Sequence, residues 1–225
     1  MRDLAKRIQH TNVAPDATAA DIGRLCSECL EYGFDAAVVN PIWASHARKI
    51  LRNSGVKVCV ALNFPTGGST TLAKVVEIRN LAAMGVDEID FMVNVGYLKS
   101  GMLDPFREDV EEMVRAAEGM TVKAILETAV LTPEEVRVAA QICEESGVHY
   151  VKNSTGWGKG GPATVEIIRF LRETVSPKVK IKASGGIRDA KTALELLSAG
   201  ADLIGSSRSV QIVSGVETSS LTTSY

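Results

Sequence analysis

Short segments with β-strand character alternate with longer segments of helical period along nearly the whole chain, and this unit recurs about eight times. The alternation is typical of βαβ units, in which each helix returns the chain to the start of the next parallel strand. It therefore predicts an α/β fold with a parallel sheet covered by helices. The expected strands are residues 7–11, 35–40, 56–62, 88–94, 121–127, 149–154, 179–184 and 202–205.

The even spacing of the units favours a closed (β/α)8 TIM barrel over an open doubly wound sheet, which is the alternative for the same pattern. Four helical segments end at a glycine just before a strand, in EYGFD, AMGVDE, ESGVHY and SAGADL, as expected for one repeated unit. The 225 residues suffice for one small barrel. We expect a barrel domain over residues 1–210 and a polar, mobile tail over residues 211–225.

The chain carries 25 basic and 27 acidic residues, so its charge predicts no general affinity for nucleic acid or anionic membranes. Its first ten residues lack the apolar core of a secretory signal, and no run approaches the roughly 18 apolar residues of a membrane span. We therefore expect a cytoplasmic protein. Cys26 and Cys29 form a C-x-x-C pair inside an amphipathic segment, and we expect buried structural thiols and no metal site.

Four consecutive expected strands carry charged residues on the face that should point into the barrel. Because successive strand side chains point to opposite faces, apolar Ile89, Phe91 and Val93 should contact the helices. Lys180, at the start of its strand, should be solvated at the barrel bottom. Barrel interiors are normally apolar, and a buried charge is costly unless it is paired. The inward charged set is Glu88, Asp90, Lys123, Glu127, Lys152, Lys180 and Lys182.

These inward charges have two explanations, a functional site or structural ion pairs. A functional role is favoured for Asp90, Lys152 and Lys182, because residues at the C-terminal ends of barrel strands are usually catalytic. For Lys123 and Glu127, a functional role and a mutual ion pair along one strand are equally consistent with the pattern.

Lys152 and Lys182 are expected on adjacent strands at similar heights. A lysine attacks a carbonyl carbon only as the free amine, whereas an unperturbed lysine, with a pKa near 10.4, is mostly protonated at neutral pH. Burial and a second nearby cation both favour the free amine, so each lysine should help to deprotonate the other. Asp90 would offset the excess charge and could transfer protons. This combination predicts Schiff-base chemistry.

Three glycine-bearing segments follow the last expected strands, at residues 154–161, 184–188 and 205–209. Backbone N–H groups in such turns and at helix N-termini bind anions, and barrels commonly bind phosphate after strands seven and eight. A phosphorylated substrate is therefore expected. The G-x-G-x-x-G match of Gly156, Gly158 and Gly161 lacks the acidic residue that supports a dinucleotide site, and we reject that alternative. The expected anion-binding residues are Thr155, Gly156, Gly185, Gly186, Gly205, Ser207 and Arg208.

With these residues in view, the sequence resembles the deoxyribose-phosphate aldolase family across nearly its whole length. The resemblance is specific, because each matching motif falls near the end of an expected strand. The motifs are VVNP at 38–41, NFPTG at 63–67, DEIDFMVN at 87–94, ILET at 125–128, VKNSTG at 151–156 and KASGGIR at 182–188.

The resemblance implies reversible cleavage of 2-deoxy-D-ribose 5-phosphate to acetaldehyde and D-glyceraldehyde 3-phosphate, without a metal or organic cofactor. It further implies that Lys152 is the Schiff-base lysine, that Lys182 perturbs it and that Asp90 is the proton-relay carboxylate. The implied partners are small phosphorylated sugars and aldehydes, and the implied assembly is a homodimer or homotetramer.

Some residues depart from the usual family pattern. Asn153 replaces a threonine and Gln9 an aspartate, and neither is expected to contact Asp90, Lys152 or Lys182. Arg208 stands where a second serine is common, and it could bind phosphate through two parallel hydrogen bonds. The final residue is a tyrosine, as in some family members, and Tyr225 is a candidate for assisting proton transfer.

Three alternatives remain open. Another lysine-dependent barrel lyase could use a longer keto-sugar phosphate, because the chemistry at Lys152 does not define the donor. A phosphosugar isomerase could use Asp90 and Glu127 as acid and base, with the lysines only neutralising phosphate. A non-catalytic barrel could bind phosphosugars without turnover.

Overall fold

The computed structural model describes residues 2–215, which form a closed barrel of eight parallel strands paired in chain order. Each strand pairs with its two sequence neighbours, and β1 pairs with β8 to close the barrel. The predicted TIM barrel is confirmed. The strands are β1 (Ile8–Asn12), β2 (Ala36–Val39), β3 (Lys57–Leu62), β4 (Glu88–Met92), β5 (Thr121–Ile125), β6 (Tyr150–Lys152), β7 (Lys180–Ser184) and β8 (Leu203–Ser206).

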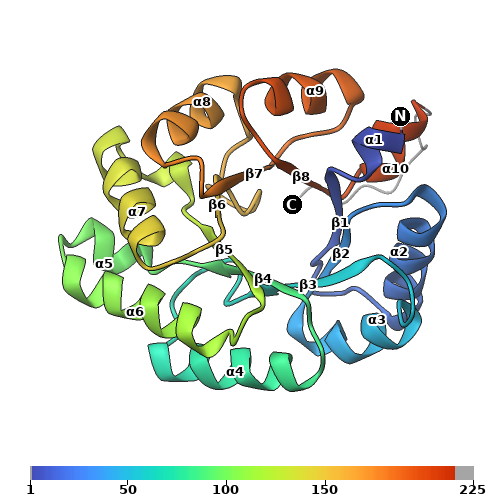
Figure 1. Cartoon of the computed structure of the whole chain (residues 1–225), viewed down its shortest axis with the longest axis horizontal. Coiled ribbons are helices and arrows are strands. Elements are labelled where there is room, and N and C mark those ends of the chain that lie inside the picture. The colour runs from blue at the N-terminus through green and yellow to red at the C-terminus, as the bar shows by residue number, and fades with distance from the viewer. Residues whose placement is uncertain (1, 216–225) are drawn as a thin grey trace.

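The helices form an outer ring around the strands, as the view in Figure 1 shows. The α-helices are α1 (Arg2–Ala5), α2 (Ala19–Tyr32), α3 (Ala44–Ile50), α4 (Thr71–Ala83), α5 (Val95–Lys99), α6 (Leu103–Ala116), α7 (Pro133–Glu145), α8 (Val165–Thr174), α9 (Ala190–Ser198) and α10 (Ser209–Ser214). Two short 3-10 helices, η1 (Pro41–Trp43) and η2 (Thr128–Val130), follow β2 and β5.

The helix boundaries follow from local capping chemistry. Thr18 begins α2 with a capping box, in which its hydroxyl accepts a bond from the Asp21 N–H and Asp21 binds the Thr18 N–H. At the other end, Gly33 adopts φ 71°, a left-handed conformation that glycine tolerates better than other residues. The three other expected helix-ending glycines also have positive φ, so this repeated signal is confirmed.

The two faces of the sheet divide as the alternation predicted. Ile89, Phe91 and Val93 are fully buried in the main core between strands and helices. The barrel interior has two unlike halves. The buried charged residues of the strands lie on β4 to β7, whereas a small apolar cluster lines the side near β1 to β3 and consists of Val13, Ala36, Val38, Cys59 and Ala61.

The C-terminal helix α10 crosses the expected domain boundary at residue 210. It packs against β1, α1, α2 and α9, and its Ile212 and Val213 are buried. Structured chain therefore continues to the end of α10, into the tail expected over residues 211–225. The rest of that tail, residues 216–225 with Tyr225, lies outside the described residues. Between residues 2 and 215, no helix has the length and apolar character needed to cross a membrane.

Candidate active site

Asp90, at the centre of β4, gathers three lysines inside the barrel. Its Oδ2 atom lies 2.9 Å from Lys152 Nζ and 2.6 Å from Lys182 Nζ, and its Oδ1 atom lies 3.1 Å from Lys123 Nζ. The strand register explains the grouping, because Asp90 is paired with Lys123 and Lys152 with Lys182 on neighbouring strands. The predicted convergence of Asp90, Lys152 and Lys182 is present.

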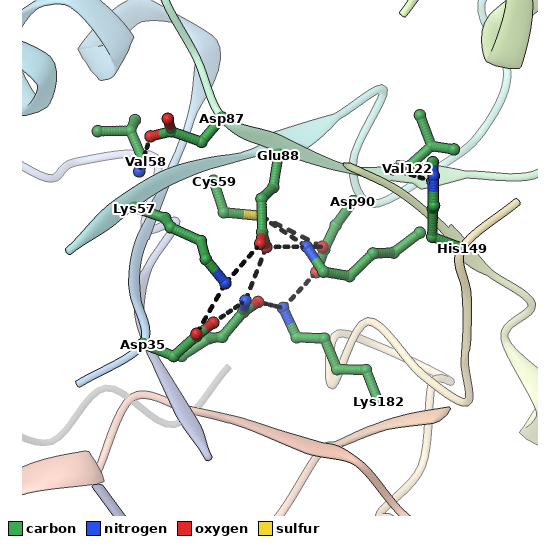
Figure 2. A network of polar contacts seen from close by, with 12 residues as sticks. Asp35, Lys57, Val58, Cys59, Asp87, Glu88, Asp90, Val122, His149 and Lys182 are labelled. Carbon is green, nitrogen blue, oxygen red and sulfur yellow. Dashed lines mark hydrogen bonds and ion pairs between the residues drawn. The ribbon is translucent and has the colours of Figure 1, made fainter. Parts of the chain in front are cut away.

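Glu88 forms a second carboxylate centre one layer below Asp90. Its Oε2 atom lies 2.5 Å from Lys123 Nζ, and its Oε1 atom lies 3.1 Å from Lys57 Nζ (Figure 2). The possible pairing of Lys123 with Glu127 is wrong, because Lys123 turns across to Glu88 and Asp90 on the adjacent strand. Cys59 also points into this cluster, with its Sγ atom 3.2 Å from Asp90 Oδ1.

The pKa values in the cluster follow from burial and charge count. Burial alone would raise the pKa of Asp90, but Lys123, Lys152 and Lys182 outweigh it and hold this pKa well below its usual range. Burial lowers the pKa of Lys182, and the charges of Lys152 and Lys123 lower it further, although Asp90 opposes them. Burial also disfavours the charge of Lys123, but Asp90 and Glu88 outweigh it and raise the pKa of Lys123 well above 10.5.

Gln9, on β1, completes this cluster, contrary to the expectation that it would not contact the three predicted residues. Its Oε1 atom accepts a hydrogen bond of 2.5 Å from Lys182 Nζ. Its Nε2 group donates to Asp35 Oδ2 at 2.7 Å and to Glu88 Oε2 at 2.8 Å. Asn153 meets the same expectation, because its side chain binds the Ser184 backbone and no member of the trio.

Backbone and side-chain bonds hold the loops that follow β6 and β7 together. Asn153 donates from Nδ2 to the Ser184 carbonyl at 3.0 Å and accepts from the Ser184 N–H at 2.9 Å, which continues the strand pairing beyond Lys152. Ser184 Oγ in turn donates to the Ser154 carbonyl at 2.5 Å. These bonds position Lys152 relative to the glycine-bearing turn that begins at Gly185.

Glu127, which follows β5, binds the loop after β6 through Thr155. It is 7% exposed, and its carboxylate accepts bonds from the Thr155 N–H at 3.0 Å and from the Thr155 hydroxyl. Its backbone is left-handed, with φ 57° and ψ 55°, a conformation that costs a non-glycine residue about 1–2 kcal/mol. A Cβ atom at Gly160 would lie 2.7 Å from Glu127 Oε1, so the loop closes tightly over this carboxylate.

A pocket opens at the C-terminal ends of the strands. Lys152 lines it, whereas Asp90 and Lys182 lie beneath its floor and are fully buried. One part of the lining is apolar and includes Phe64 and Trp157, whose rings meet edge to face at 6.0 Å. All seven residues expected to bind an anion line the same pocket: Thr155, Gly156, Gly185, Gly186, Gly205, Ser207 and Arg208.

Sequence analysis did not single out two features of this pocket. Arg188 lines it together with Arg208, and its position directly after the SGGI turn was the available signal. Phe64 and Trp157 come from loops after β3 and β6, and their meeting depends on the barrel closure. Elsewhere, among residues 2–215, no group of three or more His, Cys, Asp or Glu side chains is arranged to hold a metal ion.

The fold and the pocket together define the class of protein. A TIM barrel with a buried amine in its mouth pocket, next to glycine-rich turns, has the architecture of a barrel enzyme for small molecules.

Comparison with known proteins identifies the family within this class of barrel enzymes. Residues 5–213 match the model of the DeoC/LacD family aldolases, and the chain belongs to this family. It is 43% identical over 214 residues to the deoxyribose-phosphate aldolase of Dictyoglomus turgidum, covering 95% of this chain and 97% of that one. The deoxyribose-phosphate aldolase of Brevibacillus brevis is 45% identical over 216 residues, with 96% and 97% covered.

Solved structures agree with the sequence relatives. An aldolase designated QR15 superposes with a TM-score of 0.91 at 33% identity and covers 96% of each chain. The deoxyribose phosphate aldolase from Aeropyrum pernix, described as a unique tetramer, superposes with a TM-score of 0.88 at 30% identity, covering 94% of this chain and 90% of that one.

Proposed function

We propose that this protein catalyses the reversible aldol cleavage of 2-deoxy-D-ribose 5-phosphate to acetaldehyde and D-glyceraldehyde 3-phosphate, through a Schiff base on Lys152. The relatives' printed names support the substrate. The observation that carries the mechanism is the position of Lys152. Of the described lysines that contact Asp90, Lys152 is the one that lines the pocket, so a bound aldehyde would meet this amine.

The reaction begins when the free amine of Lys152 attacks C1 of the open-chain sugar and water leaves, which forms a protonated imine. This group withdraws electrons, so loss of the C3 hydroxyl proton breaks the C2–C3 bond and releases D-glyceraldehyde 3-phosphate. The remaining enamine takes a proton at C2, and hydrolysis of the imine releases acetaldehyde and restores Lys152. Asp90 contacts both Lys152 and Lys182 and offsets part of their positive charge, and Asp90 and Lys182 participate in proton transfer.

The phosphate group of the substrate binds at the glycine-rich end of the pocket. Gly185 and Gly186 have φ of 99° and 72°, and a Cβ atom at Gly185 would lie 2.6 Å from the Gly161 carbonyl oxygen. The turn therefore excludes larger residues at Gly185. Backbone N–H groups in such a glycine-rich turn are suited to bind an anion. Arg208 adds a cationic side chain to the lining.

The isomerase alternative is disfavoured by the partners of its two carboxylates. It requires Asp90 and Glu127 as an acid and base that share one substrate, but Asp90 is fully buried among lysines and Glu127 binds Thr155. A lyase for a longer keto-sugar phosphate would also use Lys152. Comparing acetaldehyde with dihydroxyacetone phosphate as donors separates this alternative from the proposal.

Borohydride trapping tests the proposal directly. The protein is incubated with acetaldehyde and borohydride, digested, and searched for an ethyl group by peptide mass spectrometry. We expect the adduct on Lys152, its loss in Lys152→Ala, and its retention in Lys180→Ala, which changes an exposed lysine at the opposite end of the barrel. An unmodified Lys152 under conditions that label other lysines would overturn the Schiff-base mechanism.

The remaining expectations are part of the same proposal. We propose a cytoplasmic enzyme of deoxyribose phosphate breakdown that needs no metal or organic cofactor and assembles as a homodimer or homotetramer. The tetramer described for the Aeropyrum pernix relative supports an oligomer. Activity after exhaustive treatment with chelator, and the mass in solution by light scattering, test these two points.

A further inference from the structure

Gln9 contacts charged groups on two sides, in a buried network that Lys123 also joins through Glu88 and Asp90. It is 0% exposed, and its amide lies between Lys182 on one side and the carboxylates of Asp35 and Glu88 on the other. Asp35 and Glu88 share Lys57, which is half-exposed at the bottom of the barrel. The amide of Gln9 therefore makes a neutral contact between the carboxylates of this lower ion cluster and Lys182.

The orientation of the Gln9 amide follows from its partners. The Nε2 group donates one hydrogen bond to each of two carboxylates, Asp35 and Glu88, and Oε1 accepts a hydrogen bond from Lys182 Nζ. The flipped amide would place its oxygen against both carboxylates and its N–H groups against Lys182, so electrostatic repulsion excludes it. Lys182 thus receives a carbonyl acceptor that carries no formal charge.

Lys182 and Lys123 differ in the charges that surround them. Both lysines are fully buried and both contact Asp90. The second partner of Lys123 is the carboxylate of Glu88, and the pKa of Lys123 is raised, whereas the second partner of Lys182 is Gln9, and the pKa of Lys182 is lowered. The two sites differ in two ways: Lys123 has the carboxylate of Glu88 beside it, whereas Lys182 has the neutral amide of Gln9 and the cation Lys152.

We propose that Gln9 is a positioning residue for Lys182. Its side-chain oxygen holds the Lys182 amine beside Asp90 and Lys152. Because Gln9 is neutral, Asp90 remains the carboxylate that contacts Lys182, and no second carboxylate offsets the Lys182 charge. This inference rests on the proposed function, in which Lys152 must react as a free amine. A positive charge on Lys182 that is only partly compensated favours the neutral form of Lys152. A glutamate in place of Gln9 has the same length, so its carboxylate would reach Lys182 and weaken that effect.

The groups around Lys182 come from every neighbouring part of the barrel. Asp90 carries the one negative charge in direct contact, and Lys152 and Lys123 act against the Lys182 charge. The thiol of Cys59 is kept neutral because burial raises its pKa to about 12. A carboxylate at position 9 would therefore nearly double the negative charge that Lys182 meets.

The test substitution is Gln9→Glu, which preserves the size of the side chain and adds a charge. Asp35 and Glu88 would face the second oxygen of this carboxyl group and oppose its ionisation, whereas Lys182 favours it. Because lysines titrate far above the usual pKa of a glutamate, we expect the carboxyl group to be ionised over that range. We expect the rising limb of the kcat/KM profile for 2-deoxyribose 5-phosphate cleavage to move about one pH unit upward, so that activity at neutral pH falls about tenfold and recovers at higher pH.

Two further variants separate charge from packing. Gln9→Met removes the hydrogen bonds without adding charge, and we expect a lower kcat with no upward movement of the limb. Gln141→Glu makes the same chemical change on the exposed face of α7 and should leave the profile unchanged. An upward movement of equal size in Gln9→Met would show that packing is responsible and would overturn the proposal.

A measurement on Lys182 itself separates this inference from the proposed function. Protein labelled with 15N at the lysine side chains gives an Nζ titration for Lys182, assigned by loss of its signal in Lys182→Met. We expect Gln9→Glu to raise the Lys182 midpoint by about one unit, a tenfold change in proton affinity, whether or not Lys152 forms an adduct. An unchanged midpoint in folded Gln9→Glu would overturn the role of Gln9 and leave the Schiff-base proposal standing.

Discussion

Lys152 Nζ lies 2.9 Å from Asp90 Oδ2, yet Lys152 reaches the pocket and Asp90 is fully enclosed beneath it. A carboxylate so placed acts on a reaction through the lysines and not by contact with substrate. Its single negative charge is shared among Lys123, Lys152 and Lys182, and this imbalance distinguishes the cluster from an ordinary set of core ion pairs.

Asp90→Asn is expected to cost both stability and activity. The substitution keeps the shape of the side chain but leaves three buried lysines without their shared carboxylate, and breaking a buried ion pair typically costs about 3–5 kcal/mol. We expect a lower urea midpoint, and cleavage activity reduced by about 10² to 10⁴. A variant as stable as the wild type would contradict the ionised state of Asp90.

The stability of the fold should fall in acid as Glu88 becomes protonated. Burial would raise the pKa of Glu88, but Lys123 and Lys57 lower it from 4.5 to about 2. Because the folded-state pKa lies below the unfolded value, this contribution is complete above pH 4.5 and is lost as pH falls toward 2. The shift corresponds to about 3 kcal/mol.

Urea unfolding between pH 6 and pH 2.5 measures this contribution. Glu88→Gln should show a weaker loss of stability in acid than the wild type, whereas Glu195→Gln, an exposed change on α9, should keep the wild-type slope. If the stability of Glu88→Gln and that of the wild type fell equally with pH, the acid sensitivity would come from other residues than Glu88.

The buried pair Lys74–Asp109 should stabilise the packing of α4 on α6 without affecting the reaction. Lys74 Nζ lies 2.6 Å from Asp109 Oδ2, and both residues are 1% exposed. Lys74→Met leaves the Asp109 carboxylate buried without its cation, with the Thr71 hydroxyl as its remaining partner, so we expect a loss of about 3–5 kcal/mol. The double variant Lys74→Met/Asp109→Leu should recover most of it, and kcat at low temperature should stay at the wild-type value.

Strand periodicity alone predicted a large part of this site. Alternation assigned Asp90, Lys152 and Lys182 to the barrel interior, because a period of two divides each strand into an inner and an outer set. Their proximity then followed from closure, since parallel strands in chain order bring neighbouring C-terminal ends together.

The contacts between strands could not be predicted in the same way. Whether Lys123 meets Glu127 on its own strand or Glu88 on the next depends on inter-strand register and side-chain direction, which local periodicity does not contain. Gln9 meets Lys182 across 173 positions of sequence, through the pairing of β1 with β8 that closes the barrel. The left-handed backbone of Glu127 likewise depends on a tertiary partner, Thr155.

Glu127→Ala should separate phosphate binding from chemistry at Lys152. The carboxylate holds the Thr155 N–H and hydroxyl, and Thr155 and Gly156 line the proposed phosphate end of the pocket. Its loss leaves a part-buried N–H without its acceptor and frees the loop, at a cost of roughly 1–3 kcal/mol. We therefore expect KM for 2-deoxyribose 5-phosphate to rise at least about fivefold. Borohydride trapping of acetaldehyde on Lys152 should change little, because that small donor has no phosphate. In Gly160→Ala, the added methyl group would lie against the Glu127 carboxylate and disturb the same contacts. We expect this variant, too, to raise KM while leaving the trapping of acetaldehyde nearly unchanged. Equal losses of both activities in Glu127→Ala would mean that the carboxylate positions Lys152 itself and not the loop beyond it.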